Sequence, residues 1–503
     1  MQNRTLFFGD NLEILRKKIP DETFDLIYLD PPFNSNRDYN VLFKEGLQDS
    51  PAQIKAFEDS WHWTREAKAE FDYLVKKTNA DISNLMQALE KIIGTNDVLA
   101  YLTMMTTRLI ELHRVLKKTG SIYLHCDPTA SHYLKIVLDV IFGKKNFKRE
   151  IIWSLETVSG FKSQANNWIR GHDTILFYTK SDDYFFEKQF LPHKEEYIKR
   201  FHKTDESGRK YRDDRSGGRI QYLDETKGRM LGDVWNDIMS FQQASTSAEI
   251  LGYPTQKPEA LLERIVMTSS KVGDWVLDPF CGCGTTVAAS ESLKRNWVGI
   301  DVTVLAINLI KYRLKNQFSL GEKQIYIDGL PTDLGGAKEL FKKDPFQFEF
   351  WAADLVNAIP PHGKSEENMR GADKGIDGII MFGKSTKNDK LEYGKAIVQV
   401  KGGGVQRNQI ATLKGDVERE KADAGIFITL EEPTKPMISE AIDAGTFITP
   451  LTNKFEFPKI QILTIEQLLK GDKPKLPQGL VQDYYKKAKP GEDKDLRQKV
   501  MGL

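Results

Sequence analysis

The sequence is poor in cysteine, in long apolar runs and in net charge. Only three of its 503 residues are cysteine, Cys126, Cys281 and Cys283, which is too few for a disulfide framework and leaves no second pair to complete a zinc site. No window approaches the roughly 18 apolar residues that span a bilayer, and the opening MQNRT lacks the apolar core of a signal peptide. These absences argue against a membrane partner or a disulfide-stabilised secreted protein, and we expect a cytoplasmic one.

The formal net charge of +1 hides a local asymmetry. Lys and Arg crowd residues 144–230 and the tail after Lys470, so a nucleic-acid partner is allowed, although the overall charge does not demand one. The chain lacks a Gly-Lys-Ser/Thr phosphate loop, so ATP-driven movement would require another subunit. A length of 503 residues predicts two or three domains.

Short apolar strands alternate with helical stretches from Thr5 to about Gly329. This alternation predicts a doubly wound α/β domain over residues 1–329, with a mostly parallel, Rossmann-like sheet. The expected strands are TLFFGD, FDLIYLD, SIYLHCD, IIWSLE, TILFYT, WVLDPF and WVGIDV. Residues 51–117 are expected to be a helical insertion, because AQIKAFEDSWHW and LTMMTTRLIELHRVL space their apolar positions three to four apart. Residues 181–250 are a second insertion, which is charged, glycine-containing and irregular.

The pattern restarts after DGLPTDLGG and predicts a second, smaller α/β domain over residues 330–503. A helix is expected at FQFEFWAADLVNAI, followed by strands at DGIIMF, AIVQVK, AGIFIT and TFIT. The segment KKAKPGEDKDLRQK is expected to be a charged, solvated tail.

The loop VLDPFCGCGTTVAAS, residues 276–290, predicts a ligand site. A strand ends at Asp278, a turn with Gly282 and Gly284 follows, and a small-residue helix begins near Thr285. Glycine lets a ligand approach the backbone, and a helix N-terminus offers unpaired N–H groups. Asp301 ends the next strand, where an acid can hold ribose hydroxyls. The loop matches neither a Walker loop nor a dinucleotide fingerprint, so a nucleoside without phosphates fits better; the alternative is a tight strand-to-helix connection.

A second loop, in DLIYLDPPFN, places a polar, kinked tetrapeptide after a buried-looking strand: Asp30, Pro31, Pro32 and Phe33. Alone, it could be a double-proline turn that closes the strand. Together with DPFCGCGTT, it resembles the amino-methyltransferases of DNA, which methylate N6 of adenine or N4 of cytosine with S-adenosylmethionine. DPPF precedes the glycine loop here, which is the order of the β class, and the resemblance covers most of residues 1–328.

The resemblance implies a cofactor site that also uses FFGDNLEIL and YPTQKPEALLERIV. Asp10, in the first segment, would lie near the adenine of the cofactor, and Thr255 and Lys257, in the second, would contact its methionine portion. The simpler interpretation of the second segment, a helix opened by Pro258, is compatible with that role. The implied cofactor-binding residues are Asp10, Thr255, Lys257, Asp278, Phe280, Gly282, Gly284, Thr285 and Asp301.

The resemblance also gives the DPPF turn a catalytic role. An exocyclic aromatic amine is a poor nucleophile, because its lone pair is delocalised into the ring. If Asp30 and a proline carbonyl accept hydrogen bonds from its two N–H groups, the nitrogen moves toward tetrahedral geometry and the lone pair is freed. Proline fixes φ and removes competing donors, which suits Pro31 and Pro32 to this task. Phe33 would supply a stacking face for a base rotated out of the duplex.

Residue types at this turn separate neighbouring chemistries. Methylation at cytosine C5 needs a thiolate, usually in Pro-Cys, whereas Cys126 lies in LHCDP and is expected to be a strand-end core residue. Methylation of protein glutamine tends to use Asn where Asp30 stands, with the motif after the glycine loop. In the family pattern an initial Asp and a final Phe favour adenine, so cytosine N4 remains the alternative.

Residues 181–250 would then be the target-recognition region for double-stranded DNA. The Lys and Arg of KRFHK, GRKYRDDRSGGR and KGR can contact phosphates, and longer polar side chains can reach base edges. For any single arginine a solvated surface is the alternative. Residues 51–117 resemble regions used for pairing in this class, which makes a homodimer a further hypothesis.

The second domain contains a separate set of candidate site residues, in the segments GADKGIDGIIMF and KAIVQVKGGG. Asp377 heads one strand, while Gln399 and Lys401 lie on one face of the next. From about residue 346 to 449 the chain resembles the Mrr-like branch of the PD-(D/E)xK nucleases, in which Gln replaces the second acid. The resemblance implies Mg²⁺ held by Asp377, Gln399 and the intervening carbonyl, with Glu349 as a further ligand and Lys401 orienting water. The glycine triplet after Lys401 departs from the bulkier residue usual in that family.

The sequence is therefore identified as a fused modification and restriction polypeptide. We expect a DNA adenine-N6 methyltransferase dependent on S-adenosylmethionine, with an Mrr-like nuclease domain. Two alternatives remain: a methyltransferase whose last domain only binds DNA, and a non-catalytic DNA-binding protein on a methyltransferase fold. The intact motif set argues against the second.

Overall fold

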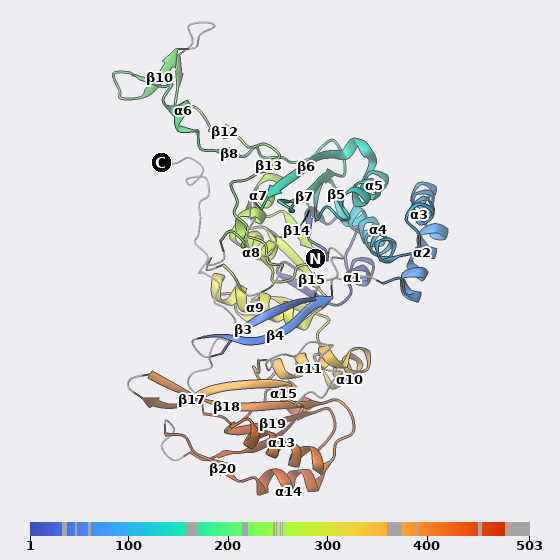
Figure 1. The fold of residues 1–503 in the computed structure, drawn as a ribbon, viewed down its shortest axis with the longest axis vertical. Coiled ribbons are helices and arrows are strands. Elements are labelled where there is room, and N and C mark those ends of the chain that lie inside the picture. The colour runs from blue at the N-terminus through green and yellow to red at the C-terminus, as the bar shows by residue number, and fades with distance from the viewer. Residues whose placement is uncertain are drawn as a thin grey trace.

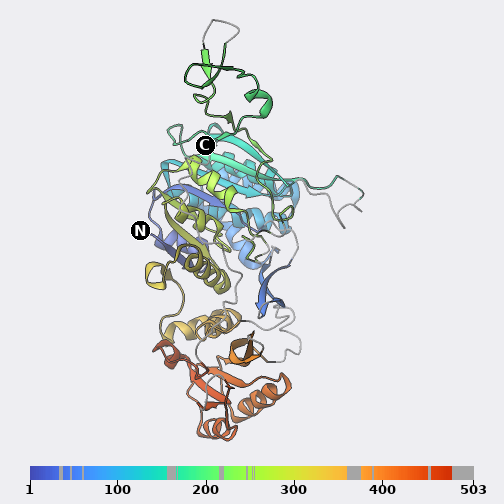
Figure 2. The ribbon, with the colours of Figure 1, turned by 90° about the vertical axis from the view of Figure 1, so that its left-hand side faces the viewer.

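The computed structural model describes two α/β bodies and an arm. The residues it describes in full are 1–32, 62–155, 166, 168–213, 220–244, 247, 249–251, 253, 255–321, 323–359, 375–385, 392–450 and 455–477; for 38–45, 48–58, 322, 386–387 and 390–391 it describes the backbone alone. Along the longest axis, the arm with β10 lies at one end, the large sheet in the middle and the second domain at the other end (Figures 1 and 2).

A nine-stranded sheet forms the first domain, in the order β13-β6-β7-β5-β2-β14-β15-β1-β16. Its members are β1 (Thr5–Phe8), β2 (Phe24–Leu29), β5 (Leu116–Cys126), β6 (Phe147–Ser154), β7 (His172–Thr179), β13 (Val234–Trp235), β14 (Trp275–Asp278), β15 (Asn296–Asp301) and β16 (Tyr326–Asp328). Only β7 runs antiparallel to its neighbours, so the expected mostly parallel sheet is confirmed.

Helices cover both faces of this sheet, which explains the near-continuous apolar sequence of its central strands. In β2, Ile27 and Leu29 pack with one group of helices, while Leu26 and Tyr28 pack with the other. The first group contains α1 (Asn11–Lys18), α4 (Asp97–Val115) and α5 (Ser131–Leu138), and the second contains α7 (Glu259–Ser269) and α8 (Thr285–Ser292). Helix α9 (Val304–Phe318) packs with Leu6 of β1. Two short turns, η1 (Asp139–Gly143) and η2 (Lys144–Asn146), follow α5, and η4 (Glu322–Gln324) follows α9.

The helical insertion is shorter than its predicted span of 51–117. Helices α2 (Arg65–Lys77) and α3 (Ala80–Ile93) pack with α4, but the backbone of β4 (Gln48–Glu58) pairs antiparallel with β3 (Asp38–Glu45). The predicted helix over residues 51–58 is therefore wrong. Alternation in PAQIKAF also fits a period of two, and a window this short does not separate the two periods. Residues 116 and 117, the last two of the predicted span, belong to β5, which begins at Leu116.

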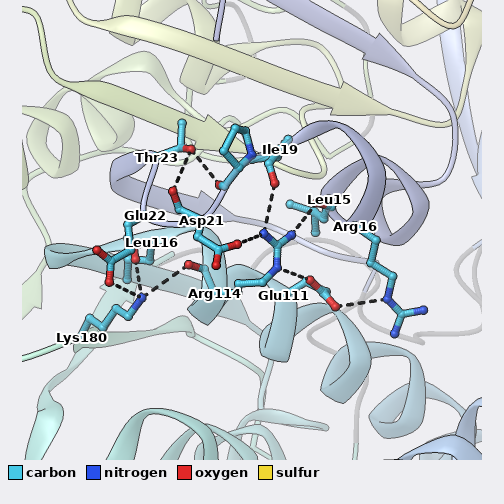
Figure 3. A network of polar contacts seen from close by, with 11 residues as sticks. Leu15, Arg16, Ile19, Asp21, Glu22, Thr23, Glu111, Arg114, Leu116 and Lys180 are labelled. Carbon is cyan, nitrogen blue, oxygen red and sulfur yellow. Dashed lines mark hydrogen bonds and ion pairs between the residues drawn. The ribbon is translucent and has the colours of Figure 1, made fainter.

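An arginine fixes the edge of the sheet where β2 begins (Figure 3). Arg114, in the last turn of α4, donates to the carbonyls of Leu15 (2.6 Å) and Ile19 (3.1 Å) at the end of α1, and also to Glu111 (2.7 Å). These bonds satisfy carbonyls that a helix end leaves open. Lys180 donates to the carbonyl of Leu116 at 2.6 Å on the same edge. The loops at the carboxyl ends of the parallel strands lie at the opposite edge of the sheet.

The irregular insertion at 181–250 forms the arm and then returns to the sheet. Its elements are α6 (Glu195–Ile198), the sheet of β9 (Lys203–Thr204), β10 (Lys210–Asp213) and β11 (Ile220–Tyr222), and the pair β8 (Phe190–Leu191) and β12 (Arg229–Met230). Arg209 lies 4.0 Å from the ring centroid of Tyr222, and Arg212 lies 5.0 Å from those of Tyr197 and Phe201. Arg209 and Arg212 thus pack on aromatic rings of the arm. The next strand, β13, pairs with β6 at the edge of the main sheet.

The second domain is a four-stranded sheet in the order β17-β18-β19-β22. Its elements are α10 (Leu334–Lys343), α11 (Pro345–Asp354), β17 (Gly378–Lys387), β18 (Lys390–Lys401), α13 (Arg407–Arg419), β19 (Ala424–Thr429), α14 (Lys435–Asp443), β22 (Ile460–Thr464) and α15 (Ile465–Leu469). The expected strand TFIT is reduced to β20 (Thr446–Phe447), which pairs with β21 (Phe457–Pro458) outside this sheet. The fourth position belongs to β22, which the sequence analysis did not anticipate.

The two domains share packing at the start of α9. Val304 is buried in the apolar cluster that holds Phe348 and Trp351 of α11, and its N–H donates to the side-chain oxygen of Gln347 at 2.9 Å. The predicted tail at 486–499 lies outside the described residues. Within the described part of the chain, no helix has the length and apolar character needed to cross a membrane.

Candidate active sites

Four neighbouring strands bring the predicted methyl-transfer residues to one edge. Strands β2, β14, β15 and β1 are adjacent and parallel, so Asp30, Asp278, Asp301 and Asp10 all lie at or just beyond their carboxyl ends. Leu277 of β14 pairs with Ile27 of β2, which places the DPPF turn beside the glycine loop. In open α/β sheets, ligands bind in the crevice at this edge.

The two glycines of the loop between β14 and α8 cannot carry side chains without strain. Gly282 and Gly284 have φ values of 47° and 74°, in the left-handed region that favours glycine. A Cβ on Gly284 would lie 2.7 Å from Cγ1 of Ile310, and one on Gly282 would lie 3.2 Å from Cε1 of Tyr253. Gly284 is the N-cap of α8, whose first residue is Thr285, as expected. Both positions therefore require glycine, because of the left-handed backbone and because Ile310 and Tyr253 occupy the space of a Cβ.

Asp301 ties this loop to the neighbouring strand. Its Oδ2 accepts from the N–H of Gly282 at 2.9 Å, and its Oδ1 accepts from the N–H and hydroxyl of Thr303 at 3.0 and 2.9 Å. Burial raises the pKa of the Asp301 carboxyl, although these donors oppose the shift. The residue expected to hold ribose therefore also fixes the shape of the glycine loop.

Asp278 supports the base of the same loop from inside the protein. Its Oδ1 accepts from the N–H of Phe280 at 3.0 Å. Burial raises the pKa of the Asp278 carboxyl to about 7, and the negative charges of Asp30 and Asp301 add to the rise while Thr286 opposes it. Asp30 and Asp301 thus both act on the Asp278 carboxyl, which is buried at 4% exposure.

Asp10 is joined to the glycine loop through residues that the sequence analysis missed. Asp10 caps α1 by accepting from the N–H of Glu13 at 3.1 Å, and Arg108 donates to it at 2.7 Å. Arg108 also donates to Oδ1 of Asn11 at 2.6 Å, and Asn11 donates to the carbonyl of Pro279 at 2.8 Å. An arginine inside an otherwise apolar helix was the available signal, because such a charge needs a partner when buried.

Asp30 forms an ion pair with Lys257. Oδ2 of Asp30 accepts from Nζ of Lys257 at 2.5 Å, and both side chains are largely buried. Oδ1 of Asp30 is buried and has no hydrogen-bond partner in the described part of the chain. A buried oxygen without a hydrogen-bond donor lowers the stability of the fold, unless a bound ligand supplies the donor. Pro31 is buried and Pro32 half-buried, whereas Phe33 lies outside the described residues.

The pairing gives Lys257 a place that the resemblance did not assign. It was expected at the methionine portion of the cofactor, and the structure sets it against the DPPF carboxylate and near the carbonyl of Thr255, at 3.5 Å. Lys257 therefore links the segment before α7 with the turn after β2. The functional roles of both residues remain predictions.

A buried polar chain runs behind Asp30 through Tyr28, His125 and Asp173. The Tyr28 hydroxyl lies 2.9 Å from Nδ1 of His125, and Nε2 of His125 lies 3.1 Å from Oδ2 of Asp173. Burial, reinforced by nearby carboxylates, raises the pKa of Tyr28 well above its ordinary value. Although burial opposes it, the hydrogen bond and charge of His125 hold the pKa of Asp173 well below its usual range. His125, one residue before the buried strand-end Cys126, was the visible signal.

The second domain brings Asp377 and Gln399 together across two antiparallel strands. Gly378 pairs with Val398, so Asp377 stands opposite Gln399, and the N–H of Asp377 donates to the Val398 carbonyl at 2.7 Å. Oδ2 of Asp377 accepts from the N–H of Val400 at 2.6 Å. The predicted pair therefore shares one face at the end of the sheet.

Two further residues were predicted for this candidate nuclease site. Lys401 is half-buried and lies two residues beyond Gln399, hence on the same face. Glu349 is half-buried on α11. No cluster of three His, Cys, Asp or Glu side chains suited to a metal was found among the described residues. The predicted set contains two acids and one amide, and its oxygen donors are of the kind that Mg²⁺ prefers.

The sheet and its edge define a methyltransferase-like α/β fold, followed by a smaller α/β domain. Residues 24–311 match the family described as DNA methylase, and the chain belongs to that family. Residues 340–452 match the family described as restriction endonuclease. The family match does not separate N6-adenine from N4-cytosine enzymes.

Known proteins of this family are similar over the first domain. The type II methyltransferase M.EcaI of Enterobacter cloacae is 29% identical over 289 residues, which are 48% of this chain and 62% of M.EcaI. The DNA adenine methyltransferase YhdJ of Escherichia coli K12 is 26% identical over 307 residues, 59% of this chain and 78% of YhdJ. TTHA0409 of Thermus thermophilus, solved with S-adenosyl-L-methionine, is 19% identical, with a TM-score of 0.33, over 62% of this chain and 95% of TTHA0409. The chain thus spans about three fifths of the length of M.EcaI.

Proposed function

We propose that residues 1–329 methylate N6 of adenine in double-stranded DNA. The buried Oδ1 of Asp30, which has no hydrogen-bond partner among the described residues, carries this proposal, because a carboxylate oxygen beside Pro31 is the acceptor that an amino group requires. The amine chemistry itself would serve cytosine N4 as well. Asp at the first position of the turn and the similarity to YhdJ, a DNA adenine methyltransferase, favour adenine.

The residues at the carboxyl edge fit S-adenosylmethionine. The glycine loop ends at the N-terminus of α8, whose N-cap is Gly284, and Asp301 accepts from the N–H of Gly282 beside it. Asp10, Thr255, Lys257, Asp278, Phe280, Gly282, Gly284, Thr285 and Asp301 would hold the cofactor or shape its site. When bound, the cofactor supplies an electrophilic methyl group on a sulfonium.

The residues of the DPPF turn would prepare the amine for this transfer. Oδ1 of Asp30 accepts a hydrogen bond from one N–H of the amine, and the carbonyl of Pro31 or Pro32 accepts from the other. The nitrogen is then held with its lone pair available, and Phe33 is assigned to stacking the base. Most of the rate enhancement would come from this positioning. The arm formed by residues 181–250 is proposed to contact the DNA, through those Lys and Arg side chains that are not engaged within the protein.

Labelled methyl transfer tests the proposal. Purified protein is incubated with S-adenosylmethionine carrying a tritiated methyl group and with genomic DNA, the DNA is digested to nucleosides, and the labelled nucleoside is identified. We expect N6-methyladenine with the native chain and labelling that is about 10²–10³-fold slower with Asp30→Ala. Label in N4-methylcytosine would replace adenine by cytosine as substrate, and labelling by the Asp30→Ala protein within tenfold of the native rate would contradict the role of the turn.

For residues 330–503 we propose Mg²⁺-dependent cleavage of DNA. The support is the pairing of Asp377 with Gln399 on the face of Lys401, within a match to restriction endonucleases. Asp377 and Gln399 would hold the ion, with Glu349 as a further ligand, and Lys401 would orient the attacking water. Unmethylated DNA with Mg²⁺ should be cut by the native chain and left intact by Lys401→Ala. Cutting by neither protein would favour a DNA-binding module without nuclease activity, and equal cutting by both would contradict the role of Lys401.

A further inference from the structure

Gln399 shares a buried hydrogen bond with Asp416, a residue of α13. Nε2 of Gln399 donates to Oδ2 of Asp416 at 2.7 Å, and the two residues are 4% and 3% exposed. The other carboxylate oxygen of Asp416 lies 2.6 Å from a guanidinium nitrogen of Arg419. These two partners compensate for the burial of the Asp416 carboxylate, because burying a charge without partners is unfavourable.

This bond determines which way the Gln399 amide faces. A carboxylate can only accept hydrogen bonds, so the amide nitrogen must point at Asp416. The amide oxygen then lies on the opposite side of the amide carbon. Donation to a negatively charged partner also polarises the amide and increases the electron density on its oxygen. An oriented, polarised amide oxygen is a good ligand for a hard cation.

We propose that Asp416 is a positioning residue for a divalent cation held by Asp377 and Gln399. This inference rests on the proposed nuclease function and goes beyond it. Asp416 fixes the Gln399 oxygen and supplies, one hydrogen bond away, the negative charge that an amide at position 399 lacks. It also explains why the position is not Glu: two carboxylates at 2.7 Å without a proton between them would repel each other.

Cation binding by the full-length chain in the absence of DNA tests the inference. Isothermal titration calorimetry with Mg²⁺ would measure the dissociation constant for the native protein, Asp377→Ala, Asp416→Ala and Asp416→Asn. We expect binding to be lost in Asp377→Ala and weakened about 10–100-fold in Asp416→Ala, as is typical when a partner of a metal ligand is removed. Asp416→Asn should fall between, because its amide oxygen can still accept from Gln399 but carries no charge.

A charge exchange provides the matched control. Gln399→Glu alone should weaken Mg²⁺ binding through repulsion by Asp416. The double variant Gln399→Glu/Asp416→Asn should recover at least native affinity, since the amide of residue 416 then donates to the carboxylate of residue 399. Thermal unfolding without metal identifies any variant that has lost its fold.

The outcomes separate the inference from the function on which it rests. Native-like Mg²⁺ affinity in a folded Asp416→Ala protein, with binding lost in Asp377→Ala, would overturn the inference alone. Failure of the double variant to recover affinity would also overturn it. Binding by the native chain that Asp377→Ala leaves unchanged, or no binding at all, would overturn both.

Discussion

Lys257 places its ammonium 2.5 Å from Oδ2 of Asp30, although 227 residues separate the two in the chain. One oxygen of Asp30 is thereby engaged, and the other is left buried without a partner in the described part of the chain. The ion pair keeps a carboxylate in place at a turn that the sequence marks with two prolines. It also fixes the orientation of the carboxylate group, and therefore the position of its other oxygen.

Removal of the Asp30 carboxylate should impair chemistry more than cofactor binding. Asp30→Ala deletes one acceptor for the amine, and loss of a single oriented hydrogen-bonding group in an active site costs about 10²–10³-fold in rate. Single-turnover methyl transfer measures the rate, and calorimetry with S-adenosylmethionine measures the affinity. A rate within tenfold of the native value would contradict the proposed role.

The Lys257–Asp30 pair should be strongly coupled in stability. Lys257→Met leaves a largely buried carboxylate without its counterion, which should lower the free energy of unfolding by about 3 kcal/mol. Asp30→Asn with Lys257→Met removes both charges and should cost clearly less than the sum of the single changes. Denaturant titrations of the four proteins give the coupling energy. Simple additivity would show that the pair contributes nothing.

Asp278 should make the protein less stable as pH rises through the weakly acidic range. Burial raises its pKa from 3.8 to about 7, so the folded state binds a proton that the unfolded state releases at lower pH. This contribution is fully present below about pH 4 and is lost as pH rises toward 7. Asp278→Asn keeps an oxygen for the N–H of Phe280 but cannot titrate. The difference in unfolding free energy between the two proteins should therefore vary between pH 4 and 7 and be constant above about pH 8.

Gly284 should tolerate a methyl group less well than a matched glycine elsewhere. Gly284 and Gly273 both have positive φ, of 74° and 86°, but a Cβ on Gly273 meets nothing within 4 Å. Ala at either position should cost about 1–2 kcal/mol for the backbone conformation. Gly284→Ala should cost about 1–3 kcal/mol more, because its Cβ would press on Ile310. Equal losses of unfolding free energy would show that Ile310 moves aside.

Much of the first domain was predictable because its signals are local. Apolar runs such as FDLIYLD form strands covered on both faces, and the two motifs begin at Asp30 and Asp278, where β2 and β14 end. Parallel strands place their carboxyl ends on one edge, so the loops were expected to meet. The hairpin of β3 and β4 was not predictable, because its segment fits both a helix and a strand until a partner strand is known.

The partners of the functional residues could not be predicted in the same way. Asp416 lies on α13 among buried Ile410, Leu413 and Val417, and this charge within an apolar stripe was a visible but ambiguous signal. Only the packing of α13 against the sheet shows that its partner is Gln399. His125 is similar, since nothing local indicates that it lies between Tyr28 and Asp173.

The sequence by itself determined the strand order along the chain, the two motif turns and the family to which they belong, because periodicity and turn residues act over a few positions. The tertiary structure alone decided that Lys257 meets Asp30, that Asn11 and Arg108 brace the glycine loop and that Asp416 orients Gln399. Each of these contacts joins residues far enough apart that only the packing of whole elements brings the atoms within hydrogen-bonding distance.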